Sequence, residues 1–422
     1  MRTILYSVLV LLGAVAYGQS TFHHTYGNPS SDQAFAATEL DGSFVIVGGR
    51  WYWYGGLGAA DMTILKLDTA SGYPIWGKRY GGSSNEGTYE LVMEPGQRYV
   101  QVGYTQSYGA GGLDAFVVIT DTAGTVLVSK TYGGNLEDMF LGATKPSIGG
   151  YIFVGYTKSF TGTEDVYVIR TDANGDTIWT RTYGTINGQE RGVEIEEVSP
   201  NRYVIVGRTN GWGSGNYDAL VIMIDSLGNP IWEYAYGTTA EEHASDVLVL
   251  GPNQILILGS GWGGGTVGSW DWWLMDIDTL GTIIGNVVSY GSVNVDRTSP
   301  GSHTDMIQTS DGGFAIVGET NVTGNFGNYD AVLLKLTPTR TIQFVRVYGG
   351  GGTEQFRDVI ERPTGGFILS GYTNSMGSGN WDMYIVGTKA DGVADNCRDA
   401  DITASYGTRN LSFFRTPKPT CP

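Results

Sequence analysis

Short apolar runs separated by turns recur along this chain in a fixed order. In the stretch that follows Tyr132, runs of strand character cover about residues 138–145, 151–155, 165–172 and 177–183. Residues 151–155 are mostly apolar, as in a strand that is buried on both faces, whereas residues 165–172 alternate between apolar and polar. An Asn-Gly pair at 174–175 is typical of a tight hairpin turn before the last run. The pattern predicts four short antiparallel β-strands.

A Tyr-Gly pair marks the start of each copy of this four-strand unit. The pair recurs, on average about every 54 residues, at Tyr26, Tyr80, Tyr132, Tyr183, Tyr236, Tyr290 and Tyr348. Four antiparallel strands in a repeat of about 50 residues are typical of a β-propeller blade. A parallel β-helix has shorter rungs, and separate small sheets would leave their edges exposed. The sequence therefore predicts an all-β fold, a seven-bladed β-propeller of four-stranded antiparallel blades.

The two ends of the repeat array predict how the ring closes. The copy that begins at Tyr348 contains its first three strands, but the residues after Gly392 lack the fourth. Residues 21–26 match residues 178–183 in pattern, with Phe22 in the position of Trp179. We therefore expect the propeller to span residues 19–392, with the N-terminal strand completing the last blade.

Two copies depart from the repeat. In the fifth copy Asn286 replaces the large ring that most copies carry before the next Tyr, and the residues around it contain an insertion. In the sixth copy, residues 337–340 replace the turn glycine. We expect an irregular blade at this point of the ring.

The composition fits many short strands joined by tight turns. The chain has 65 Gly in 422 residues, about twice the usual share, together with 12% aromatic residues, which distinguishes it from disordered chains. It carries 42 acidic against 25 basic residues, a formal net charge of −17. Nucleic-acid binding requires a basic surface, so this charge excludes that class and disfavours anionic membranes. Its simplest consequence is solubility.

The first 18 residues have the pattern of a secretory signal peptide. Arg2 is followed by an apolar segment over residues 4–15 and by small residues at 16–18. The segment is shorter than the roughly 20 residues of a membrane span, and no other apolar stretch is long enough. We expect a secreted, extracellular or cell-surface protein with no transmembrane segment.

Residues 393–422 form a polar C-terminal tail that we expect to pack loosely outside the ring. It contains Cys397 and Cys421, the two cysteines of the chain. In an oxidising compartment we expect them to form one disulfide.

The repeat resembles one found in secreted bacterial proteins, most of which are uncharacterised. The resemblance covers about residues 20–392 and is carried by segments such as Tyr80-Gly81-Gly82 and Gly327-Asn328-Tyr329-Asp330. Residues 172–179 are also similar to the Trp-docking motif of quinoprotein propellers, and the Gly-Gly turn is similar to that of kelch repeats. These resemblances imply a propeller fold and bring no known activity.

An acidic residue follows each Tyr-Gly pair; we call these residues the turn acids. They are Asp32, Glu86, Asp138, Glu190, Glu242, Asp296 and Glu354. If the first strand lines the central channel, they form a ring near one channel mouth that would suit a cation or cationic ligand. Alternatively, each carboxylate accepts N–H bonds from its adjoining turn. Repetition in every blade favours the second interpretation.

A second repeated acid opens each third strand. These residues are Asp61, Asp114, Asp165, Asp218, Asp271, Asp330 and Asp382. Carboxylates beside Gly-rich loops are compatible with Ca²⁺, but there is one Asp in each loop and no dense ladder of acids. An aspartate that caps its own loop explains the pattern more simply, so no cofactor or metal site is assigned.

Aromatic residues that exceed the repeat are the best candidates for a ligand-binding patch. They are Trp51, Tyr52, Trp53, Tyr54, Trp262, Trp270 and Trp272. Loops with exposed rings and nearby carboxylates are typical of carbohydrate-binding surfaces, although a ring in each loop also packs that loop onto its neighbour.

No catalytic residues are assigned. The four histidines are not in a metal-binding pattern, and neither a nucleophile elbow nor a phosphate-binding Gly-Lys-Ser/Thr loop is present. Three functions remain open: a non-enzymatic binding scaffold for an extracellular glycan or protein, a glycan-acting enzyme that uses a non-repeated corner of the ring, and a structural extracellular protein. The sequence favours the first.

Overall fold

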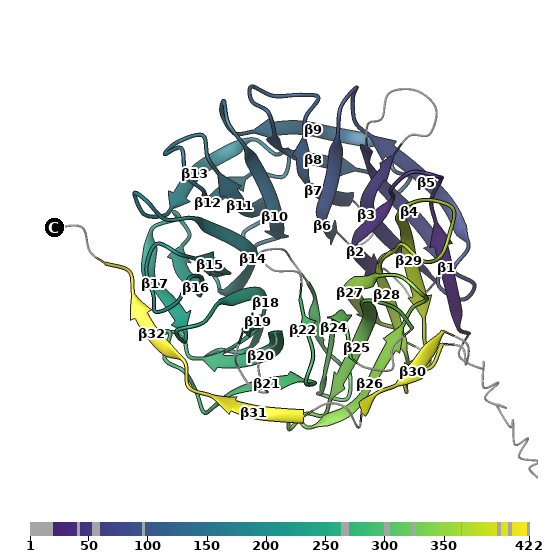
Figure 1. Cartoon of the computed structure of the whole chain (residues 1–422). Helices are drawn as coiled ribbons and strands as arrows, with labels where there is room; N and C mark the ends of the chain where they lie inside the picture. Colours follow the sequence, from purple (N-terminus) through teal and green to yellow (C-terminus); the bar gives the residue numbers. More distant parts are fainter. Residues whose placement is uncertain are drawn as a thin grey trace, which may run out of the picture.

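Seven antiparallel sheets are arranged around a central axis in the computed structural model of the chain (Figure 1). The structure describes residues 20–39, 43–52, 60–94, 98–262, 270–298, 304–322, 326–363, 365–394, 398–403 and 407–419. The signal segment, Cys397 and Cys421 lie outside these ranges, so cleavage and the disulfide stay predictions. Among the described residues, no helix is long and apolar enough to cross a membrane.

The blades are numbered in chain order, and each is given from its innermost to its outermost strand. Blade 1 contains β2 (Gln33–Glu39), β3 (Phe44–Tyr52), β4 (Ala60–Asp68) and β5 (Pro74–Tyr80); blade 2 contains β6 (Glu86–Glu94), β7 (Arg98–Thr105), β8 (Asp114–Thr120) and β9 (Val126–Tyr132). Blade 3 contains β10 (Asp138–Thr144), β11 (Tyr151–Thr157), β12 (Asp165–Thr171) and β13 (Thr177–Tyr183); blade 4 contains β14 (Glu190–Ser199), β15 (Arg202–Thr209), β16 (Asp218–Asp225) and β17 (Pro230–Gly237). Blade 5 contains β18 (Glu242–Gly251), β19 (Gln254–Trp262), β20 (Trp270–Ile277) and β21 (Val287–Gly291). Blade 6 contains β22 (Asp296–Arg297), β23 (Met306–Gln308), β24 (Phe314–Thr320), β25 (Asp330–Leu336) and β26 (Ile342–Tyr348); blade 7 contains β27 (Glu354–Glu361), β28 (Phe367–Thr373), β29 (Asp382–Gly387) and β1 (Phe22–Tyr26).

The predicted fold and its closure are confirmed. Strand β1 is the outermost strand of blade 7 and pairs antiparallel with β29, with Phe22 opposite Gly387 and Tyr26 opposite Met383. Phe22 is 7% exposed and belongs to the core between blades 7 and 1. The N-terminal strand therefore completes the sheet that the C-terminal end of the array leaves one strand short.

The core consists of apolar layers between neighbouring sheets. Each of the seven blade junctions contains a cluster of buried side chains contributed by both blades. A middle strand such as β11 or β24 is buried along its whole length because it packs against a neighbour on each face. This explains why the second run of each repeat is apolar throughout instead of alternating.

A tyrosine hydroxyl joins each blade to the next one; we call this contact the tyrosine clasp. The Tyr of each Tyr-Gly pair donates to the carbonyl of the residue at the turn between the third and fourth strands of the following blade. The pairs are Tyr26–Gly72, Tyr80–Gly124, Tyr132–Gly175, Tyr183–Gly228, Tyr236–Gly281, Tyr290–Arg340 and Tyr348–Gly392. The clasp thus occurs at every junction, including the one where the ring closes.

The turn residue in the clasp must adopt a left-handed backbone conformation. Gly281 has φ +76°, and a Cβ there would meet the ring of Tyr234 and the hydroxyl of Tyr236 in the preceding blade. Glycine satisfies both requirements. In blade 6 this position is Arg340, with φ +63°. Its guanidinium pairs with Asp276 of blade 5, with Nη2 2.7 Å from Oδ1, so the sixth copy keeps the clasp without glycine.

Blade 6 is irregular, as expected. Its innermost segment consists of two short strands, β22 and β23, and both pair with β24. Thr298, which follows β22, lies 2.7 Å from the Ser245 hydroxyl and 2.9 Å from the Ser260 hydroxyl of blade 5. Hydroxyl contacts therefore join the irregular segment to its neighbour.

The C-terminal tail does not pack loosely. It forms β30 (Asp399–Asp401), β31 (Gly407–Leu411) and β32 (Phe414–Pro417), which pair as fifth strands with β26, β21 and β17. In Figure 1 these yellow strands run along the outside of blades 6, 5 and 4 in turn. The predicted loose packing was wrong because even a polar segment can pair through its backbone. An outermost strand offers unpaired N–H and C=O groups to any extended neighbour.

Removal of residues 19–26 should destabilise the whole ring cooperatively. Without β1, the edge of β29 and the junction between blades 7 and 1 lose their partners, including the Tyr26 clasp. We expect a single thermal transition at a clearly lower temperature. The matched control is removal of residues 414–422, which strips one added strand from a complete blade. If the N-terminal deletion melted like the intact chain, the closure would not contribute to stability.

Tyr236→Phe should lower the free energy of unfolding by about 1 kcal/mol, the net contribution of one hydrogen bond. Tyr236 is fully buried and its hydroxyl donates to Gly281 O at 2.6 Å, so the variant leaves a buried carbonyl without this donor. Urea unfolding measures the change. Tyr234→Phe is the control, because Tyr234 is half-buried beside it and is not one of the clasp tyrosines. Equal stability of both variants would contradict a role for the clasp.

Candidate functional site

One side of the ring carries the loops between second and third strands and the segments that lead into the first strands; we call it the loop face. The two kinds of segment are joined between blades by backbone hydrogen bonds. Examples are Glu190 N to Glu164 O at 2.7 Å and Glu242 N to Tyr217 O at 2.9 Å. These bonds fix the loops of one blade against the start of the next, so residues far apart in sequence share one surface.

The turn acids are buried, with exposures of 0–2%, and bond their own turns. Glu86 accepts the N–H of Gly82 at 2.9 Å and the Thr105 hydroxyl at 2.7 Å, and Asp138 accepts the N–H of Gly134 at 2.8 Å and the Thr157 hydroxyl. The other blades repeat the turn N–H bond. The carboxylates thus hold the start of each first strand, and this geometry does not present them to a dissolved cation.

The acids that open the third strands also bond their own loops. Asp218 accepts N–H bonds from Ser214 at 3.0 Å and Gly215 at 3.1 Å, and Asp114 does the same with Ala110 and Gly111. Among the described residues, no group of three His, Cys, Asp or Glu side chains is placed to hold a metal ion. These aspartates therefore act as loop caps in this geometry.

A third-strand aspartate and a turn acid approach each other at several junctions, with the Gly of the Tyr-Gly pair between them. A Cβ on Gly237 would lie against carboxylate oxygens of both Asp218 and Glu242. Burial raises the pKa of Glu242 to about 7. Burial, and then Glu354, raise the pKa of Asp330 to about 7. Holding the two carboxyl groups of such a pair together therefore costs free energy when both are ionised, because like charges repel.

A third set of acids, which the repeat pattern did not reveal, lies at the axis; we call them the axial acids. Together with residues from all seven blades, they line an open cavity of about 540 Å³. They are Glu90, Glu194, Asp246, Asp305 and Asp358. Four of them stand four residues after a turn acid, at a one-residue register shift of the innermost strand. That fixed offset was the signal in the sequence that could have revealed them.

The axial acids link neighbouring blades. Asp246 accepts the N–H of Met306 at 2.7 Å, and Asp358 accepts the N–H of Ala37 at 2.7 Å. Burial raises the pKa of Asp246 to about 7, and burial together with Asp305 raises the pKa of Asp358 well above its usual range. Hydrogen bonds across the junctions therefore offset part of the cost of burying these groups.

The predicted aromatic patch is only partly on the surface. Trp51, Tyr52 and Trp270 are half-buried, and Trp262 is 48% exposed. Trp53 and Tyr54 lie outside the described residues. Trp272 differs from the expectation: it is fully buried in the core between blades 5 and 6, because residues of a middle strand pack on both faces. Of the predicted set, Trp262 is the ring that the described structure offers most openly to a ligand.

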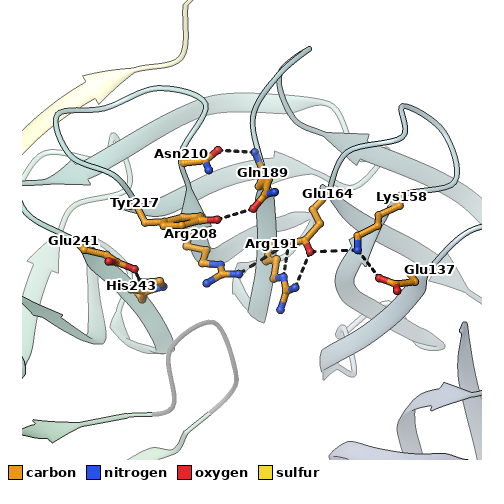
Figure 2. A network of polar contacts seen from close by, with 10 residues as sticks. All are labelled: Glu137, Lys158, Glu164, Gln189, Arg191, Arg208, Asn210, Tyr217, Glu241 and His243. Atoms are coloured by element: carbon orange, nitrogen blue, oxygen red, sulfur yellow. Dashed lines mark hydrogen bonds and ion pairs between the residues drawn. The ribbon is translucent and has the colours of Figure 1, made fainter.

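A network of polar contacts extends across blades 3, 4 and 5 on the loop face (Figure 2). Glu164 accepts two bonds from Arg191, from Nε at 2.6 Å and Nη2 at 2.7 Å. The guanidinium of Arg208 lies 4.6 Å from the Tyr217 ring centroid, and the Tyr217 hydroxyl donates to Gln189 at 2.6 Å. These contacts hold long polar side chains in fixed positions beside the axis.

His243 ends this network in blade 5. Its Nε2 lies 2.9 Å from Glu241 Oε1, and its ring stacks on Tyr217 with the centroids 5.5 Å apart. Burial lowers the pKa of His243 to about 4, so the ring is neutral near pH 7. A neutral imidazole beside a carboxylate acts here as a hydrogen-bond donor that orients Glu241.

A pocket opens beside Glu241 between blades 4 and 5; we call it the Trp262 pocket. It has a volume of about 490 Å³ and is lined by Ser214, Gly215, Asn216, Thr239, Ala240, Glu241 and Trp262. Three segments form it, and one backbone bond fixes two of them: the N–H of Trp262 donates to the Glu241 carbonyl at 2.8 Å. Residues that carry an indole, a carboxylate, an amide and two hydroxyl groups therefore line one space.

The sequence matches no protein-family model and no curated protein. Among solved structures, the chain is similar to the Pan2 WD40 domain of Neurospora crassa, at 11% identity and a TM-score of 0.47 over 85% of this chain and 89% of that one. It is also similar to quinohemoprotein alcohol dehydrogenase from Comamonas testosteroni, at 12% identity and a TM-score of 0.49 over 92% and 79%. Such distant likeness says nothing of activity, and the propeller assignment rests on the seven sheets themselves. The expected repeat family stays a resemblance.

The stability of the ring should fall as the pH rises from about 5 to about 8. Asp246, Glu242, Asp330 and Glu196 have pKa values raised to about 7 in the folded chain. A carboxyl group stabilises the fold when its pKa is higher in the folded chain than in the unfolded chain. This stabilisation is complete below the unfolded pKa and is lost as the pH rises through the folded pKa. Urea unfolding at the two pH values measures the slope.

In Asp246→Asn, the free energy of unfolding should fall less between pH 5 and pH 8 than in the wild type. The difference should be a few kcal/mol at most, because each unit of pKa shift corresponds to about 1.4 kcal/mol. The amide keeps an acceptor for the Met306 N–H and does not ionise. Asp121→Asn is the control, because turn N–H bonds lower the pKa of the exposed Asp121, which then titrates below this range. A wild-type chain as stable at pH 8 as at pH 5 would disprove the ionisation argument.

Proposed function

We propose that this protein is a secreted, non-enzymatic binding scaffold that recognises an extracellular carbohydrate through the Trp262 pocket. The observation that carries the proposal is a pocket of about 490 Å³ that is lined by both the half-exposed Trp262 and Glu241. Small-molecule sites in proteins are concave, have volumes of roughly 300–1,000 Å³ and combine apolar rings with a few placed polar groups. The Trp262 pocket has these properties.

The lining suits a sugar better than an apolar ligand. An indole face supports the apolar C–H face of a pyranose ring, while hydroxyl groups of the sugar donate to a carboxylate and exchange hydrogen bonds with amide and hydroxyl side chains. Glu241, Asn216 and Ser214 supply these groups. The Glu241 side chain is 35% exposed, so it can exchange water for a ligand hydroxyl.

The surroundings of the pocket favour a preorganised site. His243 orients Glu241 from below, and Trp270 lies against His243 with the ring centroids 5.4 Å apart. The backbone bond between Trp262 and Glu241 fixes the two segments that carry the ring and the carboxylate against each other. A site whose groups are already positioned loses less side-chain entropy when it binds.

The cellular location is part of the proposal and is supported by the N-terminal segment. The basic residue, apolar segment and small residues of positions 1–18 fit export. An exported scaffold with a carbohydrate pocket would act at a cell surface or in the surrounding matrix. Its partner is then a polysaccharide or a glycosylated protein.

Trp262→Ala should weaken glycan binding by about tenfold or more, which corresponds to 1.4 kcal/mol. Wild-type and variant chains are compared on a glycan array and then titrated with the strongest oligosaccharide. Trp262→Phe, which keeps an aromatic face, should retain part of the affinity. Phe160→Ala is the control, because Phe160 is 57% exposed in the corresponding loop of blade 3 and does not line the pocket.

Four outcomes of this experiment would contradict the proposal. Wild-type protein that binds no glycan, or that binds equally after Trp262→Ala, would exclude the pocket as a carbohydrate site. Shortening of the bound oligosaccharide during incubation would instead show a glycan-acting enzyme. Binding that survives Trp262→Ala but is lost in Trp51→Ala would move the site to blade 1.

A further inference from the structure

The outer edge of blade 2 corresponds in position to an edge that the chain's own tail covers in blade 4. Blades 2 and 4 superimpose by repeat position, so Tyr108 corresponds to Trp212, and Ser129 and Lys130 on β9 correspond to Glu233 and Tyr234 on β17. Strand β32 pairs with β17, whereas no strand pairs with the outer edge of β9 in the part of the chain that the structure describes. The two blades therefore show the same edge with and without an occupant.

In blade 4 the tail fills the groove beside the edge. The N–H of Lys418 donates to the Glu233 carbonyl at 3.1 Å, and its ammonium pairs with the Glu233 carboxylate at 2.9 Å. The same ammonium lies 5.7 Å from the Trp212 ring centroid, and Trp212 is only 8% exposed. An extended segment thus combines backbone pairing, one ion pair and cover for an aromatic ring.

In blade 2 the equivalent groove is open. Tyr108 is 49% exposed, and the groove has a volume of about 460 Å³. Its lining is Arg79, Tyr80, Gly81, Tyr108, Phe116, Val118, Val126, Ser129, Lys130 and Thr131. Phe116, Val118 and Val126 contribute apolar side chains to the lining, and Ser129, Lys130 and Thr131 belong to the edge strand β9. The groove has the features that the tail uses in blade 4, without the tail.

The charge of the two edges is opposite. Blade 4 presents Glu233 to a basic tail, whereas the blade 2 groove is lined by Arg79 and Lys130 and by no acidic residue. Lys130 pairs with Asp176 at 2.6 Å, and Asp176 is 73% exposed. Exposed ion pairs contribute little, so Lys130 can change its partner at small cost. Arg79 lies 3.3 Å from Asp61, whose side chain is 20% exposed, and adds positive charge to the groove. In a chain with net charge −17, this groove is suited to an acidic segment.

We propose that the groove and edge of blade 2 bind an extended, acidic peptide segment of a partner protein by β-strand addition to β9. The backbone of the segment pairs with the outward groups of β9, an apolar side chain enters the groove over Tyr108, and its carboxylates meet Lys130 and Arg79. Strand addition gives affinity through the backbone and specificity through the alternate side chains. The basic tail of a second copy, with Arg415 and Lys418, is the poorer match. This site is distinct from the Trp262 pocket.

The test uses the full mature chain and three synthetic peptides, with binding followed by fluorescence anisotropy. One peptide alternates glutamate with valine and phenylalanine, the second has lysine in place of glutamate, and the third has the sequence of residues 412–419. We expect the glutamate peptide to bind at least about tenfold more tightly than either of the others, a difference of 1.4 kcal/mol.

Two variants of β9 test the geometry. Thr131→Pro removes a backbone N–H that should point outward. Thr131 is two residues from Ser129, which corresponds to Glu233, whose backbone faces the tail strand. Without this N–H, binding should fall at least about tenfold. Thr131→Val keeps the N–H and should bind like the wild type. Ser129→Glu combined with Lys130→Tyr gives β9 the side chains of β17 and should reverse the preference, so that the lysine peptide binds more tightly.

Several results would overturn the proposal. They are no binding of the glutamate peptide, tighter binding of the lysine or tail peptide to the wild type, and an unchanged preference in the Ser129→Glu, Lys130→Tyr variant. Thermal melting checks that each variant is folded. If Thr131→Pro does not fold, the double variant decides, because its substitutions already occur at this edge in blade 4.

Discussion

The tyrosine clasp is the contact on which the regularity of the ring depends. Each clasp connects the outermost strand of one blade to the far turn of the next, and the acceptor is a carbonyl that a left-handed residue turns toward the tyrosine. Sheets packed through apolar layers alone could slide, because such packing is not directional. A buried hydroxyl that must reach one carbonyl fixes the position of each blade relative to its neighbour.

The Gly that follows each clasp tyrosine is required for a different reason. It lies where a third-strand aspartate and a turn acid come together, and at Gly237 a side chain would collide with both carboxylates. The Tyr-Gly pair therefore has a structural role that explains why it recurs in every copy. Its tyrosine joins one blade to the next, and its glycine leaves room for the acids that hold the loops of the loop face.

The fold was predictable from the sequence because these local requirements repeat at every junction. The number of blades followed from the Tyr-Gly period, and the ring closure followed from the match of Phe22 to Trp179. The candidate site was harder to predict from the sequence. Trp272 stood in a cluster of aromatic residues that resembled a surface patch, yet β20 is a middle strand with a neighbouring blade on each face. The axial acids were not predicted because they do not recur in every copy. Ala36 and Gly142 stand four residues after the turn acid in blades 1 and 3, where blades 2, 4, 5 and 7 have an acid. The pairing of the tail depends on backbone groups of other blades, which no side-chain pattern records.

The tail strands give the molecule an uneven response to mechanical load. They lie on blades 6, 5 and 4 in the order β30, β31, β32, opposite to the order in which the chain built those blades. A pull on the chain beyond β32 would reach one short strand at a time, and each would detach before the next one carried the load. Each tail strand would pass its load to the blade with which it pairs, so the load would move from blade 4 to blade 5 and then to blade 6. The outer belt would thus yield stepwise and dissipate work before the strands of the ring themselves separated.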